Sequence, residues 1–319
     1  MTILRTFLKG SKIIVSERRL GVMRDNTYIL TVVIPAYNVE RYIASAIDSL
    51  FDSDVRYWKW FEVLVINDGS TDKTVDIIKE CIEQLPGASV RLISKENGGH
   101  GSAINCGIAN AKGKYFKVLD GDDWVDTAAF ENLLDALSNT DVDMVVTDFS
   151  LKNPTYRQST LKQPLDSAIA RIEQSILPTK RLAMHSLTYK TSILSENHIQ
   201  LTEGIYYVDM EYSLFPMQYV KSWLYLPLNV YQYLFGRAGQ SVLLESLVKN
   251  AIHHLQVLTN ILDFWENLPS VSLRAMTEDI IDSMIDIQML INKHSSNKEI
   301  LEQQTEQLIN RYHLDKRND

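Results

Sequence analysis

Short apolar runs alternate with amphipathic segments along residues 31–147, and this alternation constrains the fold more than any other feature of the chain. Between the apolar runs, hydrophobic residues recur at helical spacing. The runs themselves are apolar throughout rather than alternating, as in sheets that are covered on both faces. The pattern predicts an α/β fold with a Rossmann-like, mainly parallel sheet flanked by helices. We expect strands at 31–35, 61–66, 90–94, 115–119 and 142–147, and helices at 40–51, 71–82, 101–111 and 127–137.

After about residue 150 the alternation weakens. Residues 181–241 are rich in aromatic side chains, which could contact a ligand or belong to the core. From about residue 242 the apolar spacing predicts helices, and 296–319 is expected to be a polar helix. The expected parts are an N-terminal extension (1–30), a main domain (31–241, with halves 31–150 and 151–241) and a C-terminal helical region (242–319).

The composition excludes several classes of protein. The chain has 319 residues, a formal net charge of -8 and a pI near 5.4, so no global basic field recruits nucleic acid. Its two cysteines, Cys81 and Cys106, form neither a disulfide framework nor a CxxC motif. No apolar run reaches the length of about 18 residues that a membrane span needs. We expect a cytoplasmic protein without a signal peptide.

Residues 1–24 are locally basic, with six Lys or Arg residues against the single acid Glu17, and are partly apolar. Such an arm could make peripheral contact with the inner face of an anionic membrane. The simpler expectation is that it packs on the body of the protein. The C-terminal helices are candidates for a homodimer contact or a membrane contact, and the sequence does not choose between them.

Four polar, glycine-rich segments follow predicted strands. In open α/β sheets, ligands bind outside the carboxyl ends of the strands, so these loops are expected to form one site. The segments are AYN at 36–38, NDGSTD at 67–72, ENGGHG at 96–101 and DGDD at 120–123.

The last of these segments places Asp120, Asp122 and Asp123 within four residues. Like charges this close raise one another's pKa unless a cation relieves the repulsion. Mg2+ and Mn2+ prefer carboxylate oxygens and leave positions open for phosphate oxygens. The alternative is a solvated acidic turn in which an aspartate caps the following helix. The shared placement of the four loops favours a metal site.

Four motifs together resemble the family 2 glycosyltransferases, which have the GT-A fold. The resemblance covers roughly residues 31–240 and implies transfer of sugar from a nucleotide-sugar with Mn2+ or Mg2+, usually with inversion at the anomeric carbon. The chain has no QxxRW motif of processive synthases, so we expect single additions. The motifs are VVIPAYN (Val32–Asn38), VINDGSTDKT (Val65–Thr74), the DGDD segment and VDMEY (Val208–Tyr212).

The resemblance assigns nucleotide contacts. Tyr37 is expected to stack on uracil, and Asp68 to accept a hydrogen bond from the uracil N3–H. Glu40 is a candidate for a ribose contact, or it favours a helix N-terminus, and Asp72 is expected to act mainly at a helix start. Arg237 can pair with diphosphate. The predicted nucleotide-binding residues are Pro35, Ala36, Tyr37, Glu40, Asp68, Gly98, Asp120, Gly121 and Arg237.

For the metal, the resemblance implies Asp122 as the direct ligand, with Asp120 reaching the ribose or a metal-bound water. Asp123 and His100 are candidates for orienting the donor sugar, and His100 could instead touch phosphate or the metal. Many family members carry Arg where this chain has Ile104, so a nucleotide contact by that Arg is not expected here.

For catalysis, the resemblance places the general base at Asp209, where Val208 replaces the Glu that is common in the family. Nearby tyrosines could raise its pKa toward useful values. Glu211 is the alternative candidate for the general base. Met210 separates the two acids, so on a helix they point apart and only one of them can act as the base.

The leading hypothesis is a metal-dependent, inverting transfer of one sugar from a UDP-sugar to a hydroxyl of a glycan, a glycoprotein or a lipid-linked saccharide. A nucleotidyltransferase is a second possibility, but it needs a basic loop near the first strand, and no Lys or Arg follows that strand before Arg41. A non-catalytic nucleotide-sugar-binding module is a third, supported by Val208 and Ile104 alone.

Overall fold

The computed structural model describes residues 28–153, 159–161, 169–171, 182–237 and 239–314. The expected N-terminal extension therefore lies almost entirely outside the described residues. All five predicted strands and all four predicted helices of the first half are present, with ends that shift by a few residues.

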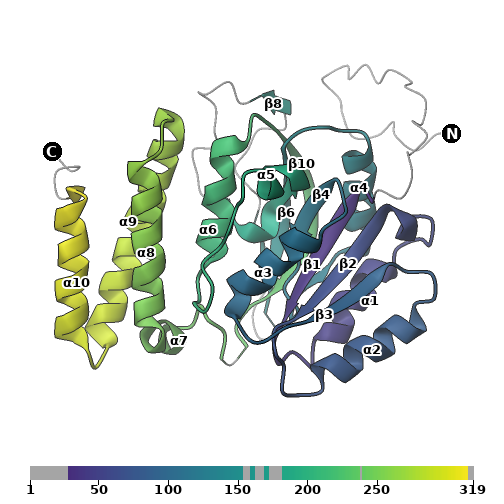
Figure 1. Ribbon diagram of the computed structural model, residues 1–319, viewed down its shortest axis with the longest axis horizontal. Coiled ribbons are helices and arrows are strands. Elements are labelled where there is room, and N and C mark those ends of the chain that lie inside the picture. The colour runs from purple at the N-terminus through teal and green to yellow at the C-terminus, as the bar shows by residue number, and fades with distance from the viewer. Residues whose placement is uncertain (1–27, 154–158, 162–168, 172–181, 238, 315–319) are drawn as a thin grey trace.

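The strands form one mixed sheet with the order β3-β2-β1-β4-β9-β6-β10-β5, to which β7 and β8 add at β6 and β10 (Figure 1). The first four strands are parallel, while β9 runs antiparallel between β4 and β6. β10 pairs in parallel with β6. The strands are β1 Leu30–Ala36, β2 Phe61–Asn67, β3 Val90–Ser94, β4 Tyr115–Val118, β5 Trp124–Val125, β6 Met144–Lys152, β7 Ser159–Leu161, β8 Ile169–Arg171, β9 Leu187–Lys190 and β10 Ser222–Leu234.

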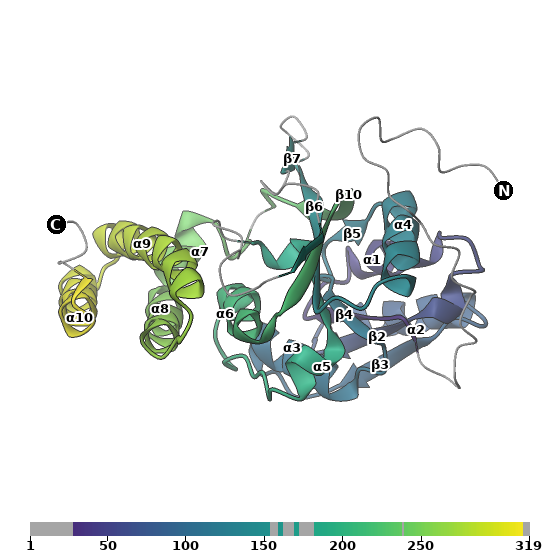
Figure 2. The ribbon, with the colours of Figure 1, turned by 90° about the horizontal axis from the view of Figure 1, so that it is seen from above.

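Helices cover both faces of the sheet, which confirms the prediction from its apolar strands. On β1, the side chains of Val32 and Ile34 enter the core beneath α1 and α4, whereas Val33 enters the core beneath α3. Figure 2 shows α1 and α4 on one face and α3, α5 and α6 on the other. The helices of the main domain are α1 Ile43–Phe51, α2 Thr74–Gln84, α3 Gly99–Asn110, α4 Thr127–Ser138, α5 Thr191–Ser195 and α6 Asp209–Leu214.

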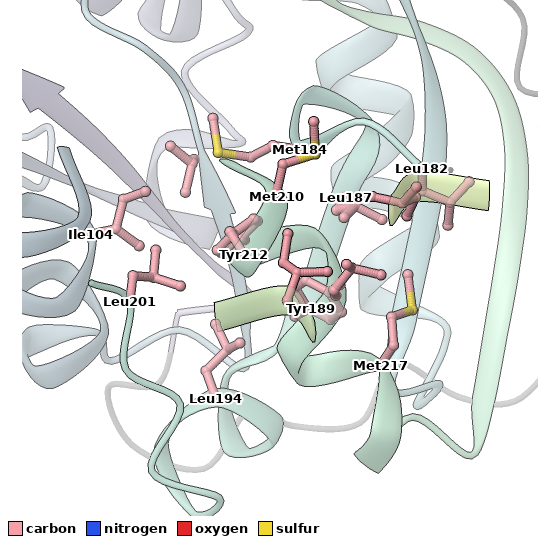
Figure 3. Close-up of a cluster of buried hydrophobic side chains, with 14 of the residues drawn as sticks. Ile104, Leu182, Met184, Leu187, Tyr189, Leu194, Leu201, Met210, Tyr212 and Met217 are labelled. Atoms are coloured by element: carbon pink, nitrogen blue, oxygen red, sulfur yellow. The ribbon is translucent and has the colours of Figure 1, made fainter. Parts of the chain in front are cut away.

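The core on the α3 face joins the two halves of the main domain (Figure 3). Ile104 of α3 lies in the same buried cluster as Tyr189 of β9, Leu194 of α5 and Tyr212 of α6. The Tyr189 and Tyr212 rings meet edge to face at 5.5 Å. The beginning of α6 is thus positioned by packing against the sheet.

The C-terminal region is helical, as predicted, with α7 Leu244–Lys249, α8 Ala251–Glu266, α9 Val271–His294 and α10 Lys298–Arg311. Both views place α6 between these helices and the sheet (Figures 1 and 2). Val257, Leu258 and Ile261 of α8 are fully buried in the cluster that contains Tyr212. No helix among the described residues is long and apolar enough to cross a bilayer.

Close packing of α3 on β1 depends on Gly107. A Cβ atom at this position would lie 2.6 Å from Val33 Cγ1. We predict that Gly107→Val lowers the free energy of unfolding by roughly 1–3 kcal/mol through overpacking. Urea denaturation measures the change, and Ala109→Val on the exposed side of the same helix is the control for a β-branched residue. Equal midpoints for the two variants would contradict this account of the contact.

Candidate functional site

A pocket of about 650 Å³ opens at the carboxyl ends of β1, β2 and β4. It is bounded by the loops that follow these strands, by the start of α6 and by the segment after β10. Glu40, Gly98 and Asp123 lie outside its lining. The predicted residues that line it are Pro35, Ala36, Tyr37, Asp68, His100, Asp120, Gly121, Asp122, Asp209 and Arg237.

Hydrogen bonds join the loops that follow β1 and β2. Asn38, at φ 53°, accepts a hydrogen bond from Thr71 N at 2.8 Å. Asp72 accepts from Glu40 N at 3.2 Å and from Thr74 N at 3.0 Å at the start of α2, which confirms its structural role. The Glu40 carboxylate in turn accepts from Lys73 N at 3.0 Å, so it serves the same helix start, and its ribose contact remains a prediction. These hydrogen bonds between the two loops leave the Tyr37 side chain half exposed in the pocket.

Asp68 is held by several donors although it is nearly fully buried. Its Oδ1 accepts from Lys95 Nζ at 2.7 Å and from Gly98 N at 3.0 Å, and its Oδ2 accepts from Gly99 N at 2.8 Å. A Cβ atom on Gly98 would lie 2.6 Å from Ser102 Oγ, so only glycine fits there. Gly98 therefore acts on the site through the orientation of Asp68.

Asp120 lies at the centre of the site. It contacts His100 Nε2 at 2.8 Å and lies 3.8 Å from His185 Nε2. Burial alone would raise the pKa of Asp120, but these two imidazoles lower it below its usual value. For His100, burial alone would lower the pKa, and Asp120 outweighs it and raises the pKa. His100 is thus tied to Asp120, and its predicted contact with the sugar, phosphate or metal is not tested by this arrangement.

Asp123 is buried beneath the loop and faces β10. It accepts from the Tyr231 hydroxyl at 2.6 Å and from Leu234 N at 2.7 Å. Burial, followed by repulsion from Asp122 and Asp120, raises its pKa well above the usual value. In the structure, Asp123 joins the acidic loop, residues 120–123, to β10. Its role in orienting the sugar remains a prediction.

Asp122 forms an ion pair with Arg237. The guanidinium donates from Nε to Asp122 Oδ2 at 2.6 Å and makes a second contact through Nη2. Burial and the neighbouring Asp120 raise the pKa of Asp122, and Arg237 opposes that shift. The Arg237 side chain also lies 5.5 Å above the Tyr42 ring. The predicted metal ligand and the predicted diphosphate contact thus lie against each other.

Three side chains could hold a cation together. Ligand atoms of Asp120, Asp123 and His185 lie within 4.8 Å of one another, and Asp122 is not part of this group. Carboxylate oxygens and a neutral imidazole suit Mn2+ and, through the carboxylates, Mg2+. The donor set therefore fits the expected ion, and it adds His185 to the residues predicted from the sequence.

The two acids of α6 have separate surroundings, as their helical spacing predicts. Asp209 begins α6 and lines the pocket beside Tyr206 and Tyr207. Glu211 is fully buried and accepts from Thr202 N at 2.7 Å, Thr202 Oγ1 at 2.9 Å and Asn260 Nδ2 at 2.7 Å. Glu211 is therefore a structural residue, which leaves Asp209 as the candidate base.

A family model described as Glycosyl transferase family 2 matches residues 31–196, just over half of the chain. The chain belongs to glycosyl transferase family 2. An uncharacterized glycosyltransferase of Rickettsia prowazekii is 31% identical over 196 residues, which are 60% of this chain and 58% of the relative. Another, from Rickettsia typhi, is 34% identical over 194 residues, 56% of this chain and 58% of the relative. The chain thus spans less than two thirds of these relatives.

Solved structures confirm the GT-A fold of this family 2 protein. Residues 1–349 of S. aureus TarS, in complex with UDP-GlcNAc, match with a TM-score of 0.63 and 18% identity over 89% of this chain and 80% of that fragment. The mannosyltransferase PcManGT of Pyrobaculum calidifontis, in complex with GDP-Man and Mn2+, matches with a TM-score of 0.57 and 18% identity over 93% and 86% of the two chains. At these identities the likeness concerns the fold.

Sequence reasoning missed three residues of this glycosyltransferase site: Lys95, His185 and Tyr231. Lys95 could have been found, because it directly follows β3 just as Asp68 follows β2, and the two strands pair in register at Asn67 and Ser94. His185 and Tyr231 carry no comparable signal. They reach Asp120 only through pairing of β9 and β10 with β6.

We predict that Glu211→Gln lowers the free energy of unfolding by about 1–3 kcal/mol, because an amide nitrogen cannot accept the hydrogen bonds that both carboxylate oxygens now accept. Asp209→Asn is the matched control, the same chemical change two residues away in the pocket lining. It should change the stability by less than about 0.5 kcal/mol. Urea denaturation of both variants is the measurement, and a stable Glu211→Gln protein would argue against this role.

Proposed function

We propose that this family 2 glycosyltransferase transfers one sugar from a UDP-sugar to an acceptor hydroxyl, with inversion and with Mn2+ or Mg2+. The observation that carries the proposal is that Tyr37, Asp68, Asp120, Asp122 and Asp209 line one pocket. An exposed aromatic ring, a buried carboxylate and an acidic cluster match the base, ribose and diphosphate of a nucleotide. TarS, whose fold is similar, binds UDP-GlcNAc.

In the proposed reaction, Asp209 takes the proton of the acceptor hydroxyl as general base. The oxygen attacks C1 of the sugar, the C1–O bond to the diphosphate breaks, and UDP leaves with the electron pair. Attack from the face opposite the leaving group inverts the anomeric carbon. Arg237, whose Nε and Nη2 both contact Asp122 Oδ2, moves from that carboxylate to the diphosphate, two oxygens of which its guanidinium can bind in a bidentate way.

The metal would be held by Asp122, with Asp120, Asp123 and His185 as the neighbouring donor group. When bound, the cation supplies positive charge that stabilises the leaving diphosphate. PcManGT, whose fold is similar, has been solved with Mn2+, which supports a cation in the proposed reaction. Cytoplasmic location, peripheral membrane contact and a homodimer remain predictions.

Calorimetry of UDP binding tests the donor and the metal together. We expect binding to require Mn2+ and to favour UDP over GDP and CDP. Asp122→Asn should weaken UDP binding in Mn2+ by roughly tenfold or more, since even residues behind a metal ligand affect affinity by this factor. Asp76→Asn on the exposed side of α2 is the control. Equal affinity with and without Mn2+ would contradict the metal, and preference for GDP would contradict the donor.

Asp209→Asn should reduce sugar transfer by roughly 100- to 10,000-fold, the usual contribution of a general base. Its UDP affinity should stay near that of the wild type, because the proton is taken from the acceptor. Released UDP, measured with and without acceptor, reports the rate. A variant with full turnover would remove Asp209 from the role. A wild-type protein that binds UDP-sugars without turning over any acceptor would favour the binding-module alternative, while family membership already disfavours a nucleotidyltransferase.

A further inference from the structure

The pocket continues past Asp209 to the C-terminal helices. Its far wall is formed by Leu247 of α7, His254 of α8, and Met284 and Ile287 of α9. All four residues lie beyond the segment 31–196 that matches the family model. The wall is mostly apolar, so the polar atoms of His254 stand out within it.

His254 is almost completely buried, with 3% of its surface exposed. Its Nδ1 lies 2.8 Å from Gln288 Oε1, and its ring meets the Tyr207 ring edge-on at 5.6 Å. Among the described residues, Nδ1 is the ring nitrogen that makes a hydrogen bond within the protein. Nε2 is therefore the nitrogen available to a ligand in the pocket.

A buried chain of hydrogen bonds sets the tautomer of this imidazole. Thr305 Oγ1 lies 2.7 Å from the Leu301 carbonyl, which can only accept, so the hydroxyl proton is used there. The hydroxyl consequently accepts from Asn292 Nδ2 at 3.0 Å. Asn292 Oδ1 then accepts from Gln288 Nε2 at 2.8 Å, and Gln288 Oε1 faces His254. An oxygen there requires a proton on His254 Nδ1, which leaves Nε2 with a lone pair.

Burial keeps that lone pair free. Burial of the ring lowers the pKa of His254, and the hydrogen bond to Gln288 opposes this shift only in part. The lowered pKa favours the neutral imidazole, in which Nε2 carries no proton. Gln288, Asn292 and Thr305 are each at most 3% exposed, so water does not compete with the chain of bonds. A neutral imidazole in this state accepts a hydrogen bond and does not donate one from Nε2.

An aromatic ring lines the same pocket. Tyr206 is 49% exposed, and its ring stacks on His253 at 5.7 Å with an interplanar angle of 21°. Tyr207 is fixed by donation from its hydroxyl to Ser241 O at 3.2 Å. A flat aromatic ring and one directed acceptor fit a ligand with an apolar face and hydroxyl groups at its edge, which describes a pyranose ring.

We propose that this part of the pocket binds a saccharide acceptor, and that His254 Nε2 accepts a hydrogen bond from one of its hydroxyls while Tyr206 lies against the sugar ring. The proposal rests on the proposed glycosyl transfer and specifies its acceptor class. It gives the C-terminal helices a role in selecting the acceptor, and it makes α9 and α10 the support that orients His254.

Nitrogen NMR of histidine-labelled wild-type protein tests the tautomer and the contact directly. The sample is saturated with UDP and Mg2+, because paramagnetic Mn2+ in the same pocket would broaden the His254 resonance, and is titrated with the methyl β-glycosides of glucose, galactose and N-acetylglucosamine. We expect His254 Nε2 to be unprotonated at neutral pH, and its resonance to shift with at least one glycoside. A protonated Nε2, or no shift with any of the three, would overturn the proposal. Because UDP binding is measured on the same sample, failure of the proposed function is seen separately as failure to bind UDP.

Kinetics of His254→Phe provides the second test, since phenylalanine keeps the ring contact with Tyr207. For the glycoside that shifts Nε2, kcat/KM should fall roughly tenfold, the value of about one hydrogen bond. UDP affinity and the slow release of UDP without acceptor should not change. The matched control is His294→Phe at the end of α9, whose ring is exposed and whose Nδ1 bonds Leu290 O. Equal kcat/KM for His254→Phe and wild type would overturn the proposal. If the variant does not fold, the NMR titration of the wild-type protein still tests the proposal.

Discussion

The hydroxyl of Tyr231 holds the acidic loop in place, and the site depends on it. It donates to Asp123 at 2.6 Å, lies 3.1 Å from Asp120 Oδ2, and accepts from Asp120 N at 3.1 Å. Three carboxylates within four residues repel one another, and these hydrogen bonds hold two of them in place against that repulsion. Tyr231 belongs to β10, and 111 residues separate it from Asp120. The acidic loop therefore takes its position only when β10 has paired with β6.

The negative charge of the acidic loop is balanced by basic side chains from three separate parts of the fold. His100 comes from the first turn of α3, His185 from the turn before β9, and Arg237 from the segment after β10. His185 packs against the Tyr231 and Tyr233 rings of β10, whereas Arg237 lies above the Tyr42 ring at the start of α1. Charged side chains of the two halves of the domain, 31–150 and 151–241, thus meet at Asp120 and Asp122. The buried cluster that contains Tyr189 and Tyr212 joins the same two halves.

The first half of the fold could be predicted because its signals are local. Each parallel strand is a short apolar run, and each loop carries its own glycines and acids, so β1 to β4 and the positions of Tyr37, Asp68 and Asp120 follow from nearby sequence. β10 could not be recognised, since Pro227 and two register shifts interrupt its pattern. The choice between Asp209 and Glu211 also needed the structure, because it depends on Asn260 of α8, 49 residues after Glu211.

Arg237 shows how the same site can accommodate two charge states. Its backbone is held by Gln240, whose Oε1 accepts from Gly236 N at 2.7 Å and from Arg237 N at 3.2 Å. Gly236, at φ 91°, permits the turn that places the side chain above Tyr42 and against Asp122. A guanidinium fork fits a carboxylate and a phosphate equally well. In the proposed reaction, rotation of this one side chain therefore exposes Asp122 to the cation and brings positive charge to the diphosphate, while the surrounding backbone stays in place.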